Sequence, residues 1–228
     1  MISQDNMITL EGLKKSYKMG KENLVVLKGL NLQVKKGELV AIMGASGSGK
    51  TTLLNIVGCL DRPTAGNYYF EDKEVSHLKS GDLARMRGQK IGFIFQTFNL
   101  LSRITALGNV ELGMTYAGGV DRQRAIEALG KVGLGKRTHH LPLELSGGEQ
   151  QRVAIARAIV KDPILFLADE PTGQLDSKSG EEVISILLSL NAEQGTTLVM
   201  VTHDASIAHR CKRIIHIKDG EITGEENV

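Results

Sequence analysis

The chain has 228 residues, of which 41% are hydrophobic, and its 28 Lys and Arg nearly balance its 26 Asp and Glu to give a formal net charge of +2. This length suffices for one sizeable core, or for one core with an appended lobe. The near-neutral chain has no basic tail, so we expect no nucleic acid partner. No apolar run approaches the ~18–20 residues that cross a bilayer, and the first residues lack the basic-then-apolar order of a signal peptide. We therefore expect a cytoplasmic polypeptide whose membrane role comes only through a partner.

Short apolar segments alternate with helical patterns along the chain, which is typical of an α/β fold with a mostly parallel sheet. Residues 7–13 and 27–34 are predicted strands joined by a polar turn, so an antiparallel sheet is expected first. The predicted parallel strands are residues 40–43, 91–95, 165–168, 198–202 and 214–218. After the last of these, Asp219 and Gly220 are expected to form a type I′ hairpin turn into a final short strand.

The middle of the chain differs, because residues 105–160 show helical periodicity and no convincing strand. We interpret this stretch as a helical subdomain inserted between two strands of the core. The whole chain of 228 residues is then a single domain. Its core is predicted at about residues 1–96 and 161–228, and its helical subdomain at about residues 97–160.

A glycine-rich loop follows the predicted strand 40–43 and precedes an apolar helical pattern. Its residues are Gly44, Ala45, Ser46, Gly47, Ser48, Gly49, Lys50 and Thr51, followed by Thr52. Strand, glycine loop and helix in this order form a phosphate-binding P-loop. The glycines let backbone N–H groups turn inward, and the helix N-terminus adds partial positive charge. Lys50 is predicted to reach the β- and γ-phosphates of a nucleotide, and the Thr51 hydroxyl to ligate Mg²⁺.

Two carboxylates, Asp169 and Glu170, follow the predicted strand 165–168. In a P-loop fold such a strand ends beside the phosphates, so Asp169 is predicted to hold Mg²⁺ through water. Glu170 is then placed to accept a proton from an attacking water. Alone, the pair would equally fit a strand end with two solvated acids.

A second helix start with anion-binding chemistry lies at residues 145–152. Ser146 is a good N-cap, and Gly147 and Gly148 expose backbone N–H groups. An ordinary capped helix would show the same residues, so the pattern alone leaves both interpretations open.

Taken in order, these motifs resemble those of the ATP-binding cassette (ABC) ATPases over nearly the whole chain. Residues 145–148 are similar to the signature motif of that family. By the same resemblance, Tyr17 falls at the adenine-stacking aromatic, Gln96 at the Q-loop glutamine and His203 at the switch histidine. Without the family, Tyr17 would equally fit a half-buried strand residue.

The resemblance implies a P-loop NTPase core with an N-terminal antiparallel β subdomain and an inserted α-helical subdomain. It also implies an ATPase that uses ATP and Mg²⁺ and works as a head-to-tail, ATP-dependent homodimer. The implied catalytic residues are Lys50, Glu170 and His203, and the implied Mg²⁺ residues are Thr51, Gln96 and Asp169. The signature residues that complete the partner's nucleotide site are Ser146, Gly147, Gly148 and Glu149.

Within the family, residues 107–112, 146–158 and 169–173 look like the lipoprotein-releasing and macrolide-export branch. The ATPases of that branch energise a separate integral membrane permease for export or extraction of substrate. This resemblance implies a peripheral location on the cytoplasmic face of the cell membrane. Glu149 and Gly108 depart from the commonest family residues, but no departure affects the implied catalytic positions.

Two other functions stay open: a soluble ABC ATPase without a permease, and a regulatory cassette that binds ATP as a scaffold. If a permease is the partner, the apolar loop at residues 97–104 is a candidate docking surface, because loops usually run over the protein surface. We expect a short permease helix to lie beside Leu100, Leu101 and Ile104.

Overall fold

A computed structural model describes residues 5–20 and 22–228 of the chain. The strands are β1 (Asn6–Met19), β2 (Glu22–Lys35), β3 (Leu39–Met43), β4 (Ala65–Phe70), β5 (Lys73–Glu74), β6 (Ile91–Ile94), β7 (Leu165–Asp169), β8 (Thr197–Val201), β9 (Arg213–Lys218) and β10 (Glu221–Asn227). The helices are α1 (Lys50–Val57), α2 (Ser80–Lys90), α3 (Ala106–Leu112), α4 (Arg122–Lys131), the 3₁₀ turn η1 (Pro142–Glu144), α5 (Gly147–Ile159), α6 (Ser177–Gln194) and α7 (Ala205–Ala208).

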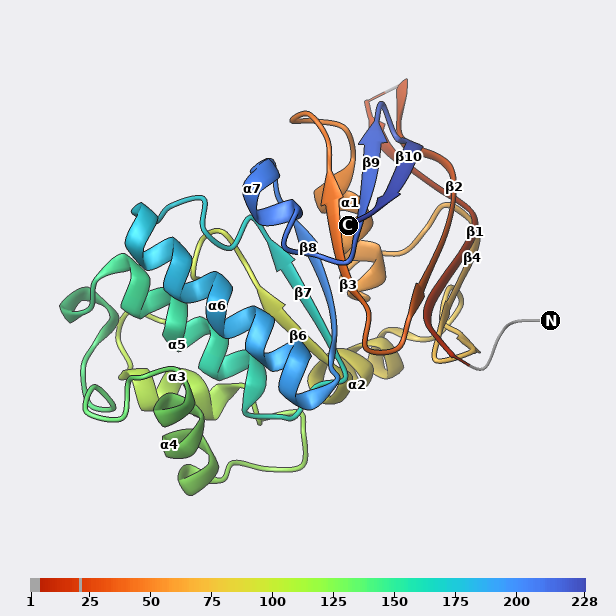
Figure 1. Ribbon diagram of the computed structural model, residues 1–228. Coiled ribbons are helices and arrows are strands. Elements are labelled where there is room, and N and C mark those ends of the chain that lie inside the picture. The colour runs from red at the N-terminus through yellow and green to blue at the C-terminus, as the bar shows by residue number, and fades with distance from the viewer. Residues whose placement is uncertain (1–4, 21) are drawn as a thin grey trace.

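The strands form two sheets. A six-stranded sheet has the order β10-β9-β3-β8-β7-β6, in which only the edge strand β10 runs antiparallel to its neighbour. A four-stranded antiparallel sheet has the order β2-β1-β4-β5. Figure 1 shows α3 to α6 on one side of the parallel strands, with α1 and the antiparallel sheet on the other. This architecture confirms the predicted fold class.

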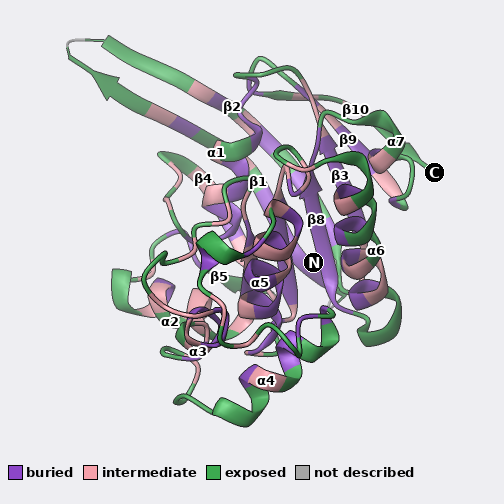
Figure 2. Cartoon of the chain, turned by 90° about the vertical axis from the view of Figure 1, so that its left-hand side faces the viewer, coloured by how far each residue is buried: buried purple, intermediate pink, exposed green. Residues whose placement is uncertain are grey.

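The parallel strands are buried on both faces, and alternate residues serve different cores. In β3, Leu39 and Ala41 pack with the helices α3 to α6, whereas Val40 and Ile42 pack with α1 and the antiparallel sheet. Figure 2 shows the resulting buried interior along β3 and β8. Because both faces of these strands are covered, polar functional groups can reach solvent only at the strand ends.

The predicted strands and turn are found close to their expected bounds. Asp219 and Gly220, with φ of 48° and 81°, have the left-handed conformations that a type I′ turn requires. Strands β1 and β2 are longer than expected, at 14 residues each. Figure 2 shows the outer part of these two strands projecting from the body as a two-stranded arm. The residues of the arm are exposed on both faces, so they lack the alternation of apolar and polar residues that marks a half-buried strand.

Helices α3, α4 and α5, with η1, occupy the stretch where a helical subdomain was expected. Their buried side chains join those of α6 and of the parallel sheet in one hydrophobic cluster. The proposed boundaries of core and helical subdomain therefore stay a prediction. Within residues 5–20 and 22–228, none of the helices combines the length and apolar character that a bilayer-spanning segment needs.

Candidate functional site

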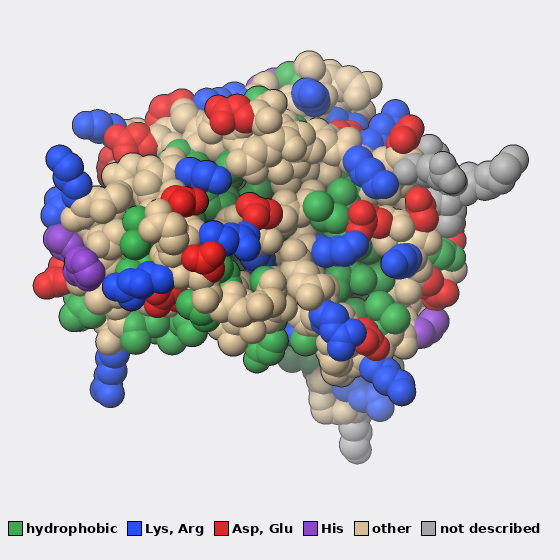
Figure 3. Space-filling model, turned by 90° about the horizontal axis from the view of Figure 1, so that it is seen from below, with side chains coloured by type: hydrophobic (Ala, Val, Ile, Leu, Met, Phe, Trp, Pro, Cys, Tyr) green, Lys and Arg blue, Asp and Glu red, His purple; other side chains and the backbone are tan. Residues whose placement is uncertain are grey.

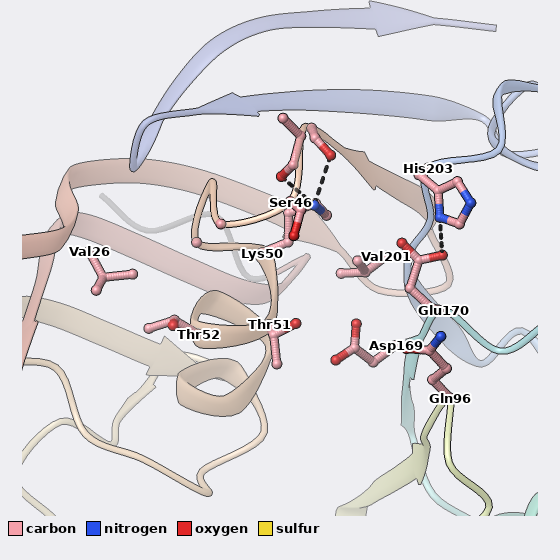
Figure 4. A pocket seen from close by; sticks show the side chains of 14 residues that line it. Val26, Ser46, Lys50, Thr51, Thr52, Gln96, Asp169, Glu170, Val201 and His203 are labelled. Atoms are coloured by element: carbon pink, nitrogen blue, oxygen red, sulfur yellow. Dashed lines mark hydrogen bonds and ion pairs between the residues drawn. The ribbon is translucent and has the colours of Figure 1, made fainter. Parts of the chain in front are cut away.

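A cavity of about 600 Å³ opens where the parallel strands end (Figure 4). The loop after β3 and the start of α1 form one wall of this cavity, and the segments that follow β6, β7 and β8 form the facing wall. Its lining residues are Val26, Gly44, Ala45, Ser46, Gly47, Gly49, Lys50, Thr51, Thr52, Gln96, Asp169, Glu170, Val201 and His203. The structure thus brings the predicted P-loop, Gln96, both acids and His203 around one space.

The loop from Gly44 to Lys50 has a shape that depends on glycine. Gly49, with φ of 102°, is the N-cap of α1 and has a conformation that other residues rarely adopt. At Gly44, a Cβ atom would lie 2.1 Å from the carbonyl oxygen of Ile217, so a side chain does not fit. The Lys50 ammonium donates to the carbonyls of Gly44 and Ala45, both at 2.8 Å, and so lies folded over its own loop.

Asp169, the last residue of β7, faces the start of α1 across the cavity (Figure 4). Burial raises the pKa of this carboxyl group, and the charge of Glu170 raises it further. A hydrogen bond with Thr51 and the charge of Lys50 lower the pKa but do not cancel the effect of burial. A cation beside Asp169 and Thr51 would relieve this cost, and their oxygens are ligands that Mg²⁺ prefers.

Glu170 and His203 form a bonded pair on the same wall. A Glu170 carboxylate oxygen lies 2.8 Å from Nδ1 of His203 (Figure 4). Glu170 has φ of 47°, which is uncommon for a residue with a side chain and marks local backbone strain. Such strain often occurs at functional sites, and the contact with His203 holds the carboxylate on this wall of the cavity.

Gln151 is a site-supporting residue that the sequence did not reveal. Its side chain is fully buried on α5, and its amide donates to the carbonyls of Phe95 at 3.1 Å and of Pro171 at 2.7 Å. These residues flank Gln96 and Glu170 respectively, so Gln151 links both segments. A polar residue within the apolar helical pattern 147–159 was the available signal.

The signature residues lie outside the cavity lining. Ser146 is the N-cap of α5: its hydroxyl accepts from the Glu149 amide at 3.2 Å, and the Glu149 carboxylate accepts from the Ser146 amide at 2.9 Å. Hydrogen bonds from the Ser146 backbone are the largest cause of the lowered pKa of Glu149. Ser146 itself is exposed, while Gly148 packs against Ser179 of α6.

Tyr17 also lies outside the cavity lining, next to it on β1. Its hydroxyl donates to the Asp61 carboxylate at 2.7 Å and lies near Thr52, which does line the cavity. The residue is 37% exposed, so its side chain is accessible from solvent. The expected contact with adenine stays a prediction.

Comparison with known proteins gives consistent matches. The family described as ABC transporter matches residues 27–173. The chain is 52% identical over 223 residues to the uncharacterized ABC transporter ATP-binding protein YvrO of Bacillus subtilis, covering 96% of this chain and 97% of that one. It is 49% identical over 225 residues to the macrolide export ATP-binding/permease protein MacB of Syntrophobacter fumaroxidans, covering 96% of this chain but only 32% of MacB.

The fold of the chain also matches that of a solved structure. The ATP-binding cassette MJ0796 of Methanocaldococcus jannaschii, in a dimeric post-hydrolysis state bound to ADP and Pi, matches with a TM-score of 0.90 and 49% sequence identity. The match covers 97% of this chain and 98% of that one.

The raised pKa of Asp169 predicts a pH-dependent stability effect. A carboxyl group whose pKa is higher in the folded than in the unfolded protein favours folding while protonated, and this contribution is lost as the pH rises through the folded-state pKa. At pH 7 the charge of Asp169 therefore opposes folding. We expect Asp169→Asn to raise the free energy of unfolding at pH 7 without nucleotide or Mg²⁺, and to lose this advantage as the pH falls through the raised folded-state pKa toward the ordinary pKa of about 3.9.

Urea unfolding of both proteins across this pH range measures the effect. Asp72→Asn, which removes an exposed turn carboxylate, is the matched control and should change stability little. A loss of stability in Asp169→Asn at pH 7 would contradict the prediction.

Proposed function

This chain belongs to the ABC transporter family, and we propose how its residues bind and hydrolyse ATP and pass the change to a membrane permease. As an ATP-binding subunit of this family, the chain is an ATPase. The observation that carries the assignment of roles is the cavity in which a P-loop faces Asp169 and the bonded Glu170–His203 pair. The related cassette MJ0796, which binds ADP and Pi, supports placing the nucleotide there.

We assign the phosphates to the P-loop wall. Backbone amides of residues 47–52 and the Lys50 ammonium would hold the β- and γ-phosphates, and Lys50 would exchange its two carbonyl partners for phosphate oxygens. Thr51, Gln96 and Asp169 would hold Mg²⁺, and the hydroxyl, amide and carboxylate oxygens of these residues fit that ion. When bound, Mg²⁺ neutralises charge on the transferred phosphoryl group.

Hydrolysis requires in-line attack of water on the γ-phosphate, and Glu170 is the proposed base. Its carboxylate lines the cavity, and one carboxylate oxygen lies 2.8 Å from Nδ1 of His203. His203 would therefore orient the base and steady the γ-phosphate. Catalysis is then mainly positioning and charge stabilisation, since phosphoryl transfer needs little covalent chemistry from the protein.

We propose that two copies assemble head to tail, with ATP between them. Ser146 is exposed and lies outside the cavity of its own subunit, at the N-terminus of α5, where the partial positive charge of the helix favours an anion. The dimeric structures of MJ0796 support assembly in pairs. Ser146, Gly147, Gly148 and Glu149 of one subunit would complete the nucleotide site of the other, so that hydrolysis weakens the interface.

A groove of about 460 Å³ between α2 and the end of α3 is the proposed permease site. Its apolar lining includes Leu60, Phe93, Phe95, Leu112 and Tyr116, and its basic lining comprises Arg87, Arg157 and Lys161. The loop at residues 97–104 contributes Asn99 to the groove, whereas Leu100 packs against the core and Leu101 points to solvent with 55% of its surface exposed. Docking therefore fits the groove better than the expected surface beside Leu100, Leu101 and Ile104.

The basic side chains of the groove indicate what kind of partner it would bind. Lys161 donates to the carbonyl of Arg87 at 2.8 Å, and Arg157 donates to those of Phe98 and Asn99 at 2.9 and 2.6 Å. In the described part of the chain, no carboxylate pairs with these two cations or with Arg87. Burial, followed by the charges of Arg157 and Arg87, lowers the pKa of Lys161 to about 8. A short permease helix with an apolar face and a carboxylate would fit.

We place the working subunit at the cytoplasmic face of the cell membrane, held there by its permease. Figure 3 shows the underside formed by α2, α3 and α4, where hydrophobic side chains lie among charges of both signs. Such a mixed surface suits a protein partner better than direct contact with an anionic membrane. The similarity to MacB supports export or extraction of substrate from the membrane.

The first prediction tests the base. Glu170→Gln keeps the size and hydrogen bonding of the side chain but removes its negative charge. We expect nucleotide binding near normal and steady-state ATP hydrolysis reduced by roughly 10²–10⁴-fold, the usual contribution of a positioned base. Phosphate release and calorimetry measure the two quantities. Near-normal turnover would refute the role of Glu170.

The second prediction tests the composite site. In the Glu170→Gln background, ATP should convert monomer to dimer in light scattering. Adding Ser146→Arg should abolish that dimer, because its bulk and charge would occupy the partner's γ-phosphate position, while ADP binding to the monomer stays normal. Ser102→Arg, at an exposed position outside both the cavity lining and residues 145–152, is the control. A stable ATP dimer of the Ser146→Arg protein would exclude the head-to-tail arrangement.

The third prediction compares the two candidate docking surfaces. Leu112→Asp with Tyr116→Asp should abolish co-purification of the permease from solubilised membranes while sparing basal ATPase activity, since both side chains are exposed. Leu101→Asp with Ile104→Asp should keep the permease bound. The reverse result would place docking beside the loop at residues 97–104. Melting temperatures of both double variants and of the wild type check folding.

A further inference from the structure

Tyr17 is held by the Lys15–Asp61 ion pair, which takes no part in the proposed hydrolysis of ATP. The Asp61 carboxylate accepts the Tyr17 hydroxyl at 2.7 Å and the Lys15 ammonium at 2.6 Å, and it also accepts the backbone amide of Arg62 at 2.7 Å. Lys15 makes a second bond, to the Arg62 carbonyl, at 2.8 Å. With 9% of its surface exposed, Lys15 is a buried cation that depends on these partners.

The same lysine closes one face of the aromatic ring. Its ammonium lies over the Tyr17 ring, 4.7 Å from the ring centroid. A cation at this distance is attracted to the electron-rich face of the ring. With Lys15 on one face, a planar ligand can stack only on the other.

These contacts also connect the ring to the helix of the P-loop. The pairing of β1 with β4 ends at Lys14 and Ala65, and beyond it β1 pairs with β2 in the projecting arm (Figure 2). Asp61, which bonds the Tyr17 hydroxyl, lies in the turn that leaves α1, four residues after the last helical residue Val57. The segment that leaves the phosphate-loop helix therefore fixes the position of the Tyr17 hydroxyl.

We propose that Asp61 and Lys15 are positioning residues that hold the Tyr17 ring, with a single free face, for stacking by the adenine base of ATP. The proposal rests on the assignment of Tyr17 as the base-stacking residue. It adds that the ring is ordered before nucleotide arrives, so binding does not have to immobilise it. Burial raises the pKa of Asp61, but its bonds from Lys15 and Tyr17 outweigh burial and leave the pKa lowered, so the carboxylate is charged near neutral pH.

The test compares ADP with pyrophosphate, which offers phosphates but no base, by calorimetry on the nucleotide-free protein. Tyr17→Phe keeps the ring and the Lys15–Asp61 ion pair but loses the hydroxyl bond. Asp61→Asn removes the charge that holds both partners. Ordering one side chain on binding corresponds to a loss of about two- to tenfold in affinity. We expect each variant to lose this much for ADP and nothing for pyrophosphate, and the double variant to lose no more than either single variant.

Tyr69→Phe, which removes the hydroxyl of another partly exposed strand tyrosine, is the matched control and should bind ADP as the wild type does. Tyr17→Ala reports on stacking itself and should lose more than Tyr17→Phe, again for ADP alone. If Tyr17→Ala weakens ADP binding while Tyr17→Phe and Asp61→Asn do not, positioning is refuted and stacking survives. If Tyr17→Ala has no effect, stacking fails too. An equal loss for pyrophosphate in Asp61→Asn would show damage to the P-loop and overturn the proposal.

Discussion

Parallel pairing of β3 with β8, and of β8 with β7, brings the site together. Each of these strands is buried on both faces, so it cannot present polar groups along its length. Their carboxyl ends lie at one edge of the sheet. Gly44 and Glu170 directly follow β3 and β7, and His203 follows β8 after Thr202. The continuous burial of the strands thus decides where phosphate, base and histidine can meet.

Helix α5 joins this edge to the rest of the molecule. It begins at the exposed cap Ser146, and farther along Gln151 bonds the carbonyls of Phe95 and Pro171. Near its end, Arg157 bonds the carbonyls of Phe98 and Asn99, at the rim of the groove. One helix therefore contacts the proposed dimer surface, the segments around Gln96 and Glu170, and the proposed permease groove. A displacement of α5 must either carry these segments along or break four hydrogen bonds.

The site is less favourable for folding than its surroundings. Glu170 has a strained backbone, Asp169 is buried enough to raise its pKa, and the Ser48 hydroxyl is buried without a hydrogen-bond partner within the described residues. The two hydrophobic clusters on either side of the sheet compensate for these costs. Such features are typical of sites arranged for a ligand, because binding relieves costs that the free protein bears.

Features with a local physical cause were determined by the sequence alone. Glycine conformation fixed the P-loop and the turn at Asp219 and Gly220, side-chain capping fixed the start of α5, and short continuous apolar runs fixed the parallel strands. Helix α6 has comparable local signals, since the Asp176 side chain caps its start and Gly195 ends it in a left-handed conformation. Helix α2 has no side-chain cap at its start. Leu83 is its single buried residue, so no apolar stripe marks this helix in the sequence either.

Only the tertiary structure decided which distant residues touch. Gln151 reaches Phe95 across 56 positions, and Tyr17 reaches Asp61 across 44. The groove likewise combines α2 with the end of α3 and with α5. A hydrogen bond or an ion pair between distant segments leaves no periodicity, cap or turn residue in either one, so it exists as a pattern only once the chain has folded.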